Sequence, residues 1–145
     1  MADLNRFLHA QDDFGTYSQA LREMKAGRKI THWMWFIFPQ LRGLGHSSNS
    51  IYYGIESLKE AEDYLADPVL GKRLREITSA VLSHKDDDIL AIMGSGIDAK
   101  KFRSSMTLFD AVCPGDVFAE ALEAFFSGQR DSRTEGMLQT TPNTN

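Results

Sequence analysis

Three things are scarce in this sequence: cysteine, excess positive charge and long apolar runs. The single cysteine, Cys113, excludes an internal disulfide, and without a second thiol it cannot build a thiolate zinc site. We therefore expect a soluble protein of a reducing compartment, the cytoplasm. With 16 Lys and Arg against 20 Asp and Glu, the net charge of -4 argues against nucleic-acid or anionic-membrane partners. The longest apolar run, Trp33 to Phe38, is too short to cross a bilayer.

What is present is typical of one globular domain. The chain has 145 residues, of which 42% are hydrophobic and 25% charged, and a chain of this size can bury a core without disulfides or metal. We expect a single domain over residues 1–138 and a disordered polar tail, QTTPNTN, over residues 139–145. The expected fold is all-α, with six to seven helices around one core and little or no sheet.

Apolar residues recur at three- and four-residue steps, the spacing of one face of a helix. This pattern appears in four segments: Phe14, Tyr17, Leu21 and Met24; Leu70, Leu74, Ile77 and Val81; Phe102, Met106, Phe109 and Cys113; and Phe118, Ala121, Leu122 and Phe125. Polar residues suited to helix starts come before five of the expected helices, and we assign as their N-caps Asp13, Ser57, Asp67, Asp98 and Asp116.

The apolar run from Trp33 to Phe38 fits either a buried strand or a buried helix, because it has no polar face. Pro39 favours an extended backbone at Phe38 in both cases. We predict a short buried helix, since the rest of the chain has helical spacing and offers no partner strand. On this interpretation Trp33 and Trp35 belong to the core; the alternative is that one of them is exposed and stacks on a planar ligand together with Tyr52 or Tyr53.

The loop PQLRGLGHSSNSIYYG, which follows this run, is a candidate ligand loop. Gly43 and Gly45 allow backbone shapes in which successive amides can surround an anion. The segment lacks both the third glycine of a dinucleotide fingerprint and the Gly-Lys-Ser/Thr of a P-loop. Two interpretations stay open, an anion-binding loop or an ordinary turn between buried elements. The further candidates in this loop are Gln40, Arg42, His46, Ser47, Ser50 and Tyr53.

A second candidate is the helix expected to start at Asp98. Lys100, Lys101 and Arg103 would crowd its first turn, where the helix dipole disfavours cations. A bound phosphate or carboxylate would offset this conflict, but a solvated basic turn would tolerate it. The hydroxyls that could assist such an anion are those of Ser104, Ser105 and Thr107.

Isolated ionisable residues complete the set. Arg73 lies at the edge of an apolar stripe and needs either an acidic partner or an anionic ligand. His32 and His46 are the candidate general bases, with a structural hydrogen bond as the alternative for each. The four histidines show no close metal-ligand spacing, so we expect no metal and no cofactor.

Three stretches of the chain resemble one bacterial family, the domain-of-unknown-function 1810 family. They are KITHWMWFIFPQLRGLGHSSNSIYYGI, EAEDYLADPVLGKRLREI and RSSMTLFDAV. The resemblance implies a single multihelical domain and brings no established activity or ligand residues. The resembling positions that could bear chemistry are His32, Gln40, Gly43, Gly45, Ser47, Ser50, Tyr53, Arg73, Lys101, Ser104, Ser105, Thr107 and Asp131.

Two functional hypotheses follow. In the first, the glycine loop and the start of the Asp98 helix meet across a site for a small anion, phosphorylated or nucleotide-like, and the question of an enzymatic role stays open. In the second, the protein is a non-enzymatic interaction module or a homodimer. Its patch would come from the apolar run and from Phe125 and Phe126.

Overall fold

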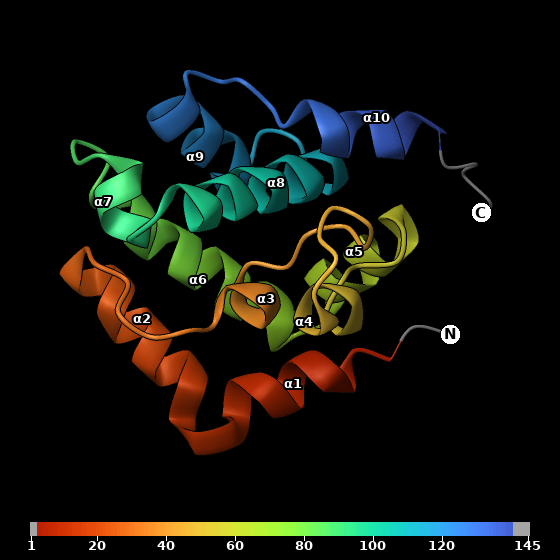
Figure 1. Ribbon diagram of the computed structural model, residues 1–145, viewed down its shortest axis with the longest axis horizontal. Helices are drawn as coiled ribbons and strands as arrows, with labels where there is room; N and C mark the ends of the chain where they lie inside the picture. Colours follow the sequence, from red (N-terminus) through yellow and green to blue (C-terminus); the bar gives the residue numbers. More distant parts are fainter. Residues whose placement is uncertain (1–2, 141–145) are drawn as a thin grey trace.

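The computed structural model describes residues 3–140, which contain helices and no strand. The predicted all-α class is therefore confirmed for this part of the chain. The elements are α1 (Asn5–Asp12), η1 (Asp13–Gly15), α2 (Thr16–Ala26), α3 (Met34–Ile37), α4 (Ser48–Tyr52), α5 (Leu58–Ala66), α6 (Leu70–Leu82), α7 (Ile89–Met93), α8 (Gly96–Val112), α9 (Val117–Phe126) and α10 (Ser132–Thr140) (Figure 1). Helices α4 and α10 lie where the sequence predicted none, and most of the predicted tail lies outside the described residues.

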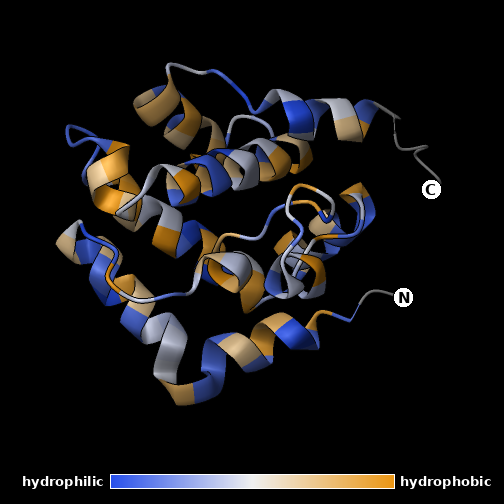
Figure 2. Cartoon of the chain, in the orientation of Figure 1, coloured by the Kyte–Doolittle hydropathy of each residue, from blue (hydrophilic) through white to orange (hydrophobic). Residues whose placement is uncertain are grey.

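The long helix α8 lies in the middle of the molecule, between α9 on one side and α5 and α6 on the other (Figure 1). Its predicted apolar face is buried, because Phe102, Met106 and Phe109 have no exposed surface. Phe102 meets Phe38 edge to face, with 5.0 Å between ring centroids. Figure 2 shows that α9 is mostly apolar, whereas the turn between α6 and α7 is hydrophilic. The core therefore surrounds α8 and fixes the direction of its polar side.

The apolar run forms a short helix, as predicted, over Met34–Ile37. Phe38 leaves it before Pro39 with a backbone that is neither helical nor fully extended (φ -121°, ψ 73°), so the predicted extended conformation is met only in its departure from the helix. Trp33 is fully buried at its start, where its indole Nε1 donates a 3.0 Å hydrogen bond to Glu23 of α2. This bond ties the run to α2.

Glu23 is a buried anchor for the segment that joins α2 to α3. Its carboxylate also accepts hydrogen bonds from the amides of Ile30 and Thr31, the Thr31 hydroxyl and Gln19. Burial alone would raise the pKa of Glu23, but these hydrogen bonds outweigh it and lower the pKa to about 2. The group therefore stays ionised and holds five donors in place.

The predicted helical face at Phe14 and the predicted cap at Asp13 are wrong. Helix α2 begins only at Thr16, after Gly15 has adopted a left-handed conformation (φ 64°). The chain turns sharply at this point between α1 and α2, which leaves Phe14 at φ 55° and fully exposed. No helix within residues 3–140 has the length and hydropathy needed to span a membrane.

Candidate functional site

The glycine loop, α8 and the start of α10 meet around an open cleft of about 570 Å³. The cleft is lined by Gln40, Leu44, Gly45, His46, Ser47, Ser50, Ile97, Lys100, Lys101, Ser104, Asp131, Ser132 and Arg133. Segments more than 80 positions apart in the sequence thus contribute to one hollow.

Backbone contacts hold the loop wall of the cleft. The carbonyl of Gln40 accepts from the Ile55 amide, and the Arg42 amide donates to the Ile55 carbonyl, both at 2.8 Å. A side chain at Gly45 would not fit, because its Cβ would lie 2.5 Å from the Ser50 hydroxyl oxygen. Ser47 caps α4 by accepting from the Ser50 amide, and its hydroxyl donates to that of Ser50 at 2.9 Å. Ser47 is thus a helix cap as well as a lining residue.

The α8 wall begins earlier than the sequence predicted. Ser95, not Asp98, caps the helix by accepting from the Asp98 amide at 3.1 Å, so the predicted Asp98 cap is wrong. Asp98 instead pairs with Lys29 at 3.1 Å. Lys100 and Lys101 consequently lie in the second turn, where the unfavourable dipole interaction is weaker than predicted.

Lys101 and Ser104 lie one turn apart on the side of α8 that faces the cleft. The Ser104 side chain is only 6% exposed, and its hydroxyl forms no hydrogen bond with any residue from 3 to 140. The Lys101 ammonium forms no ion pair in that range and lies 5.0 Å above the centre of the Trp35 ring. A nearly buried hydroxyl and an unpaired ammonium therefore face the same hollow.

A second, much smaller hollow adjoins the cleft, and we call it the inner recess. Its volume of about 10 Å³ is enough for one atom the size of a water oxygen. Gln40, Ser50 and Lys101 line both hollows. The full lining of the recess is Met34, Trp35, Phe38, Gln40, Asn49, Ser50, Tyr53, Gly54 and Lys101.

Two aromatic residues of the inner recess carry donors. The Trp35 indole nitrogen is buried and has no hydrogen-bond partner within the described part of the chain. Burial, followed by the proximity of Tyr52, raises the pKa of Tyr53, so its hydroxyl keeps its proton at neutral pH. The recess therefore contains several groups that can donate, set among apolar side chains.

The third wall, at the start of α10, is fastened to α8 by two of the predicted ligand residues. Arg103 donates to the carbonyls of Gln129 and Arg130 at 2.9 and 3.0 Å. The Thr107 hydroxyl accepts from the Asp131 amide at 2.9 Å. Asp131 in turn accepts from the amide and hydroxyl of Thr134, so it caps α10. The structure thus gives Arg103 and Thr107 structural partners, while Asp131 lines the cleft.

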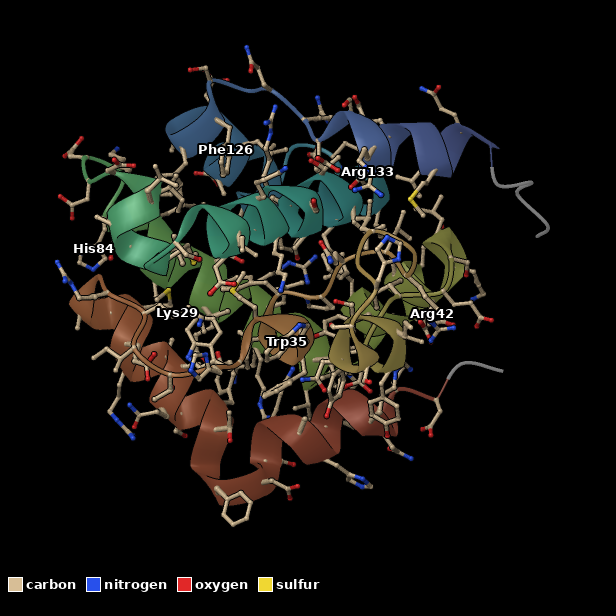
Figure 3. The ribbon with its side chains drawn as sticks, in the orientation of Figure 1. Lys29, Trp35, Arg42, His84, Phe126 and Arg133 are labelled. Atoms are coloured by element: carbon tan, nitrogen blue, oxygen red, sulfur yellow. The ribbon has the colours of Figure 1, made fainter. Side chains whose placement is uncertain are left out.

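Other predicted residues lie away from the cleft. Arg42 projects to a different face, where its Nε donates to the Ile51 carbonyl; Figure 3 shows it near the edge of the molecule, apart from the central Trp35. Arg73 pairs with Asp12 at 2.8 Å, the acidic-partner alternative. Ser105 is fully buried in the core.

Of the two candidate bases and the two loop glycines, one of each lines the cleft and the other does not. His46 lines the cleft and is exposed, whereas His32 is exposed outside it. Gly45 lines the cleft, whereas Gly43 (φ 105°) does not, and a Cβ added to it would meet the Met137 side chain at 3.1 Å. Within residues 3–140 no three His, Cys, Asp or Glu side chains gather closely enough to hold a metal ion.

The interpretation of the sequence favoured the core over a ligand contact for Trp35, and it missed the residues contributed by α10. Arg133 lies on α10 at the cleft (Figure 3). Its segment, SRTEGMLQT, has only a weak apolar face, which explains why no helix was predicted there. The feature of the sequence that could have identified Trp35 as a lining residue is its position close to a loop rich in polar residues.

Residues 1–138 match the family described as "Protein of unknown function (DUF1810)". The chain belongs to this family. The resemblance inferred from the three quoted stretches is thus confirmed. The chain is also similar to a solved structure, the conserved hypothetical protein Rv1873 from Mycobacterium tuberculosis. The two sequences are 44% identical, the match covers 96% of this chain and 98% of the other, and the TM-score is 0.90. No curated protein matches this DUF1810 chain.

Proposed function

We propose that the cleft binds a small ligand that carries a phosphate or carboxylate group. The observation that supports this most directly is the pair formed by Lys101 and Ser104. The Ser104 hydroxyl opens onto the cleft and forms no hydrogen bond within residues 3–140, so folding does not use it. A ligand oxygen would supply the missing acceptor, and the neighbouring ammonium would favour an anionic one.

The charge of the cleft supports the same proposal. Its lining includes the cations Lys100, Lys101 and Arg133 and a single acid, Asp131. The protein as a whole has a net charge of -4, so the cleft differs in sign from the rest of the molecule. A concave surface lined by one sign of charge raises the local concentration of oppositely charged ligands.

An enzymatic role would depend on His46. It is the histidine at the cleft, and its ring forms no hydrogen bond within the described residues that would orient it as a base. Binding requires no proton carrier. The proposal is therefore limited to binding.

Self-association stays a prediction without support from the patch on which it was based. The apolar run is mostly buried, with Trp33, Met34, Ile37 and Phe38 at 2% exposure or less. Phe125 and Phe126 are half-buried and pack against the core. Measuring the molar mass at several protein concentrations by light scattering would test for a homodimer.

A binding experiment tests the proposal with a matched pair of charge-removing variants. Lys101→Gln removes the cleft ammonium, and Lys72→Gln removes an exposed one on α6. We expect ribose 5-phosphate, AMP or citrate to raise the melting temperature of the wild type and of K72Q. A ligand at a hundred times its Kd adds about 2.7 kcal/mol, which is easily measured.

For K101Q we expect affinity to fall by about tenfold or more, because a charge-assisted hydrogen bond contributes roughly 1.5–3 kcal/mol. Isothermal titration calorimetry would measure this loss. The proposal would be contradicted if none of the three compounds stabilised the wild type, or if K72Q and K101Q bound equally well.

A further inference from the structure

The inner recess has a size and lining that the proposed cleft site does not by itself explain. Its volume of about 10 Å³ admits one oxygen atom and excludes a ring or a methylene chain. It adjoins the cleft through Gln40, Ser50 and Lys101, which line both hollows. A group bound in the cleft beside Lys101 therefore lies next to an opening that fits a single atom.

The lining of the recess is rich in donors without partners. The indole N–H of Trp35 is one of four buried side-chain atoms for which residues 3–140 provide no hydrogen-bond partner. The Gln40 side-chain amide also lacks an intramolecular partner in that range, and so does the Lys101 ammonium. Buried donors are nearly always paired in folded proteins, so the unpaired indole N–H of a residue that lines a hollow indicates an acceptor supplied from outside the chain; because this nitrogen is itself buried, the ring has to shift slightly to reach that acceptor.

We infer that the recess is an oxygen-binding subsite for a phosphoryl group, in which Trp35 and Gln40 donate to one phosphate oxygen while Lys101 and Ser104 bind the oxygens that remain in the cleft. This inference rests on the proposed function and specifies its ligand class, a phosphate monoester. Trp35 becomes a binding residue, a role that its apolar surroundings concealed.

The arrangement of donors selects phosphate over carboxylate. A carboxylate has two oxygens in one plane, whereas a phosphate has oxygens that point in tetrahedral directions. One of them can enter the recess while others face Ser104 and Lys101 on α8. Each phosphate oxygen accepts more than one hydrogen bond, which fits a site with at least four donors.

Nuclear magnetic resonance offers a direct test, because the chain has two tryptophans in contrasting environments. Trp33 donates its indole N–H to Glu23, so it serves as an internal control. In a titration of the 15N-labelled full-length protein with inorganic phosphate, we expect the Trp35 indole signal to move downfield and the Trp33 indole signal to stay in place. Trp35→Phe assigns the signals, because it deletes one of them and keeps an aromatic ring.

The outcomes separate this inference from the proposed function. We expect W35F to weaken phosphate binding by about tenfold or more, the effect of one lost hydrogen bond to a charged group, without changing acetate binding. If phosphate shifts the backbone signals of Lys101 and Ser104 but not the Trp35 indole, the recess inference is overturned and the cleft site survives. Equal affinity for acetate and phosphate overturns the choice of phosphate. No shift with phosphate or acetate overturns both proposals.

Discussion

Two polar regions of this protein, the corner between α1, α2 and α6 and the cleft beside α8, are built from similar residue types but differ in how their hydrogen bonds are used. In the corner, Gln11 is 2% exposed and every polar atom of its side chain is engaged. Its amide donates to the Phe36 carbonyl at 2.8 Å and to the Tyr64 hydroxyl at 3.2 Å, and its oxygen accepts from Arg73 at 3.1 Å. This region is polar and internally satisfied.

The charged groups of the corner and its second tyrosine, Tyr17, also have partners within the protein. Arg73 pairs with Asp12, and its guanidinium lies 5.0 Å above the Tyr17 ring. The Tyr17 hydroxyl donates to Glu76 at 2.6 Å. Burial, followed by this hydrogen bond, raises the pKa of Tyr17, so the hydroxyl stays a donor at all physiological pH values.

The cleft shows the opposite condition. Gln40, Lys101 and Ser104 repeat the amide, cation and hydroxyl of the corner, yet none of the three side chains has a hydrogen-bond or ion-pair partner within residues 3–140. The corner therefore contributes to the stability of the fold, whereas the cleft leaves its polar groups for an external partner. The predictions below test whether this distinction between structural and functional polar groups holds.

The largest effect is expected at Glu23, the most heavily used structural polar group. Glu23→Ala would remove the acceptor of five hydrogen bonds and leave the Trp33 indole and the Thr31 amide without a partner. We expect the free energy of unfolding to fall by about 3–4 kcal/mol, measured by urea denaturation. Glu62→Ala, at an exposed position on α5, serves as the control and should change it by less than about 0.5 kcal/mol. A loss at Glu23 as small as that at Glu62 would contradict the assigned role.

The same carboxylate predicts how stability depends on pH. Because the folded pKa of about 2 lies below the ordinary value of 4.5, the stabilisation by Glu23 is complete above pH 4.5 and is lost as the pH falls toward 2. We expect urea midpoints to decline over this window in the wild type. In Glu23→Gln the decline should be shallower, since no carboxylate remains to be protonated at that position. Parallel profiles for the two proteins would show that other acids control the decline.

The sequence was sufficient for the parts of the fold that depend on local spacing. The helices around Leu74 and Phe109 were predicted because apolar residues repeat along one face, and burial follows directly from that repeat. The helix at Met34–Ile37 needed one further argument, the lack of a partner strand. The start of α8 was misplaced because Ser95 and Asp98 are both good N-cap residues.

The composition of the cleft depends on rotation and tertiary packing, which the sequence alone did not show. Ser104 and Ser105 are adjacent and identical in type, but 100° of helix rotation directs one toward the cleft and the other into the core. Arg42 is a neighbour of cleft residues in sequence and faces a different hollow. Asp131 and Arg133 reach the cleft only because α10 folds back over α8.

The smallest effect, and the sharpest comparison, comes from deleting one hydroxyl in each region. Tyr17→Phe removes a donor used within the corner, so we expect the free energy of unfolding to fall by about 1 kcal/mol. Ser104→Ala removes a hydroxyl that lacks a partner in the described residues, and alanine is the better helix former, so stability should be unchanged or rise by about 0.5 kcal/mol. Urea denaturation at pH 7 measures both changes in the free energy of unfolding.

Equal losses in the two variants would mean that the Ser104 hydroxyl stabilises the fold, and the distinction between the corner and the cleft would then fail. A stable S104A that binds phosphate more weakly would instead identify a hydroxyl kept for binding at a cost in stability.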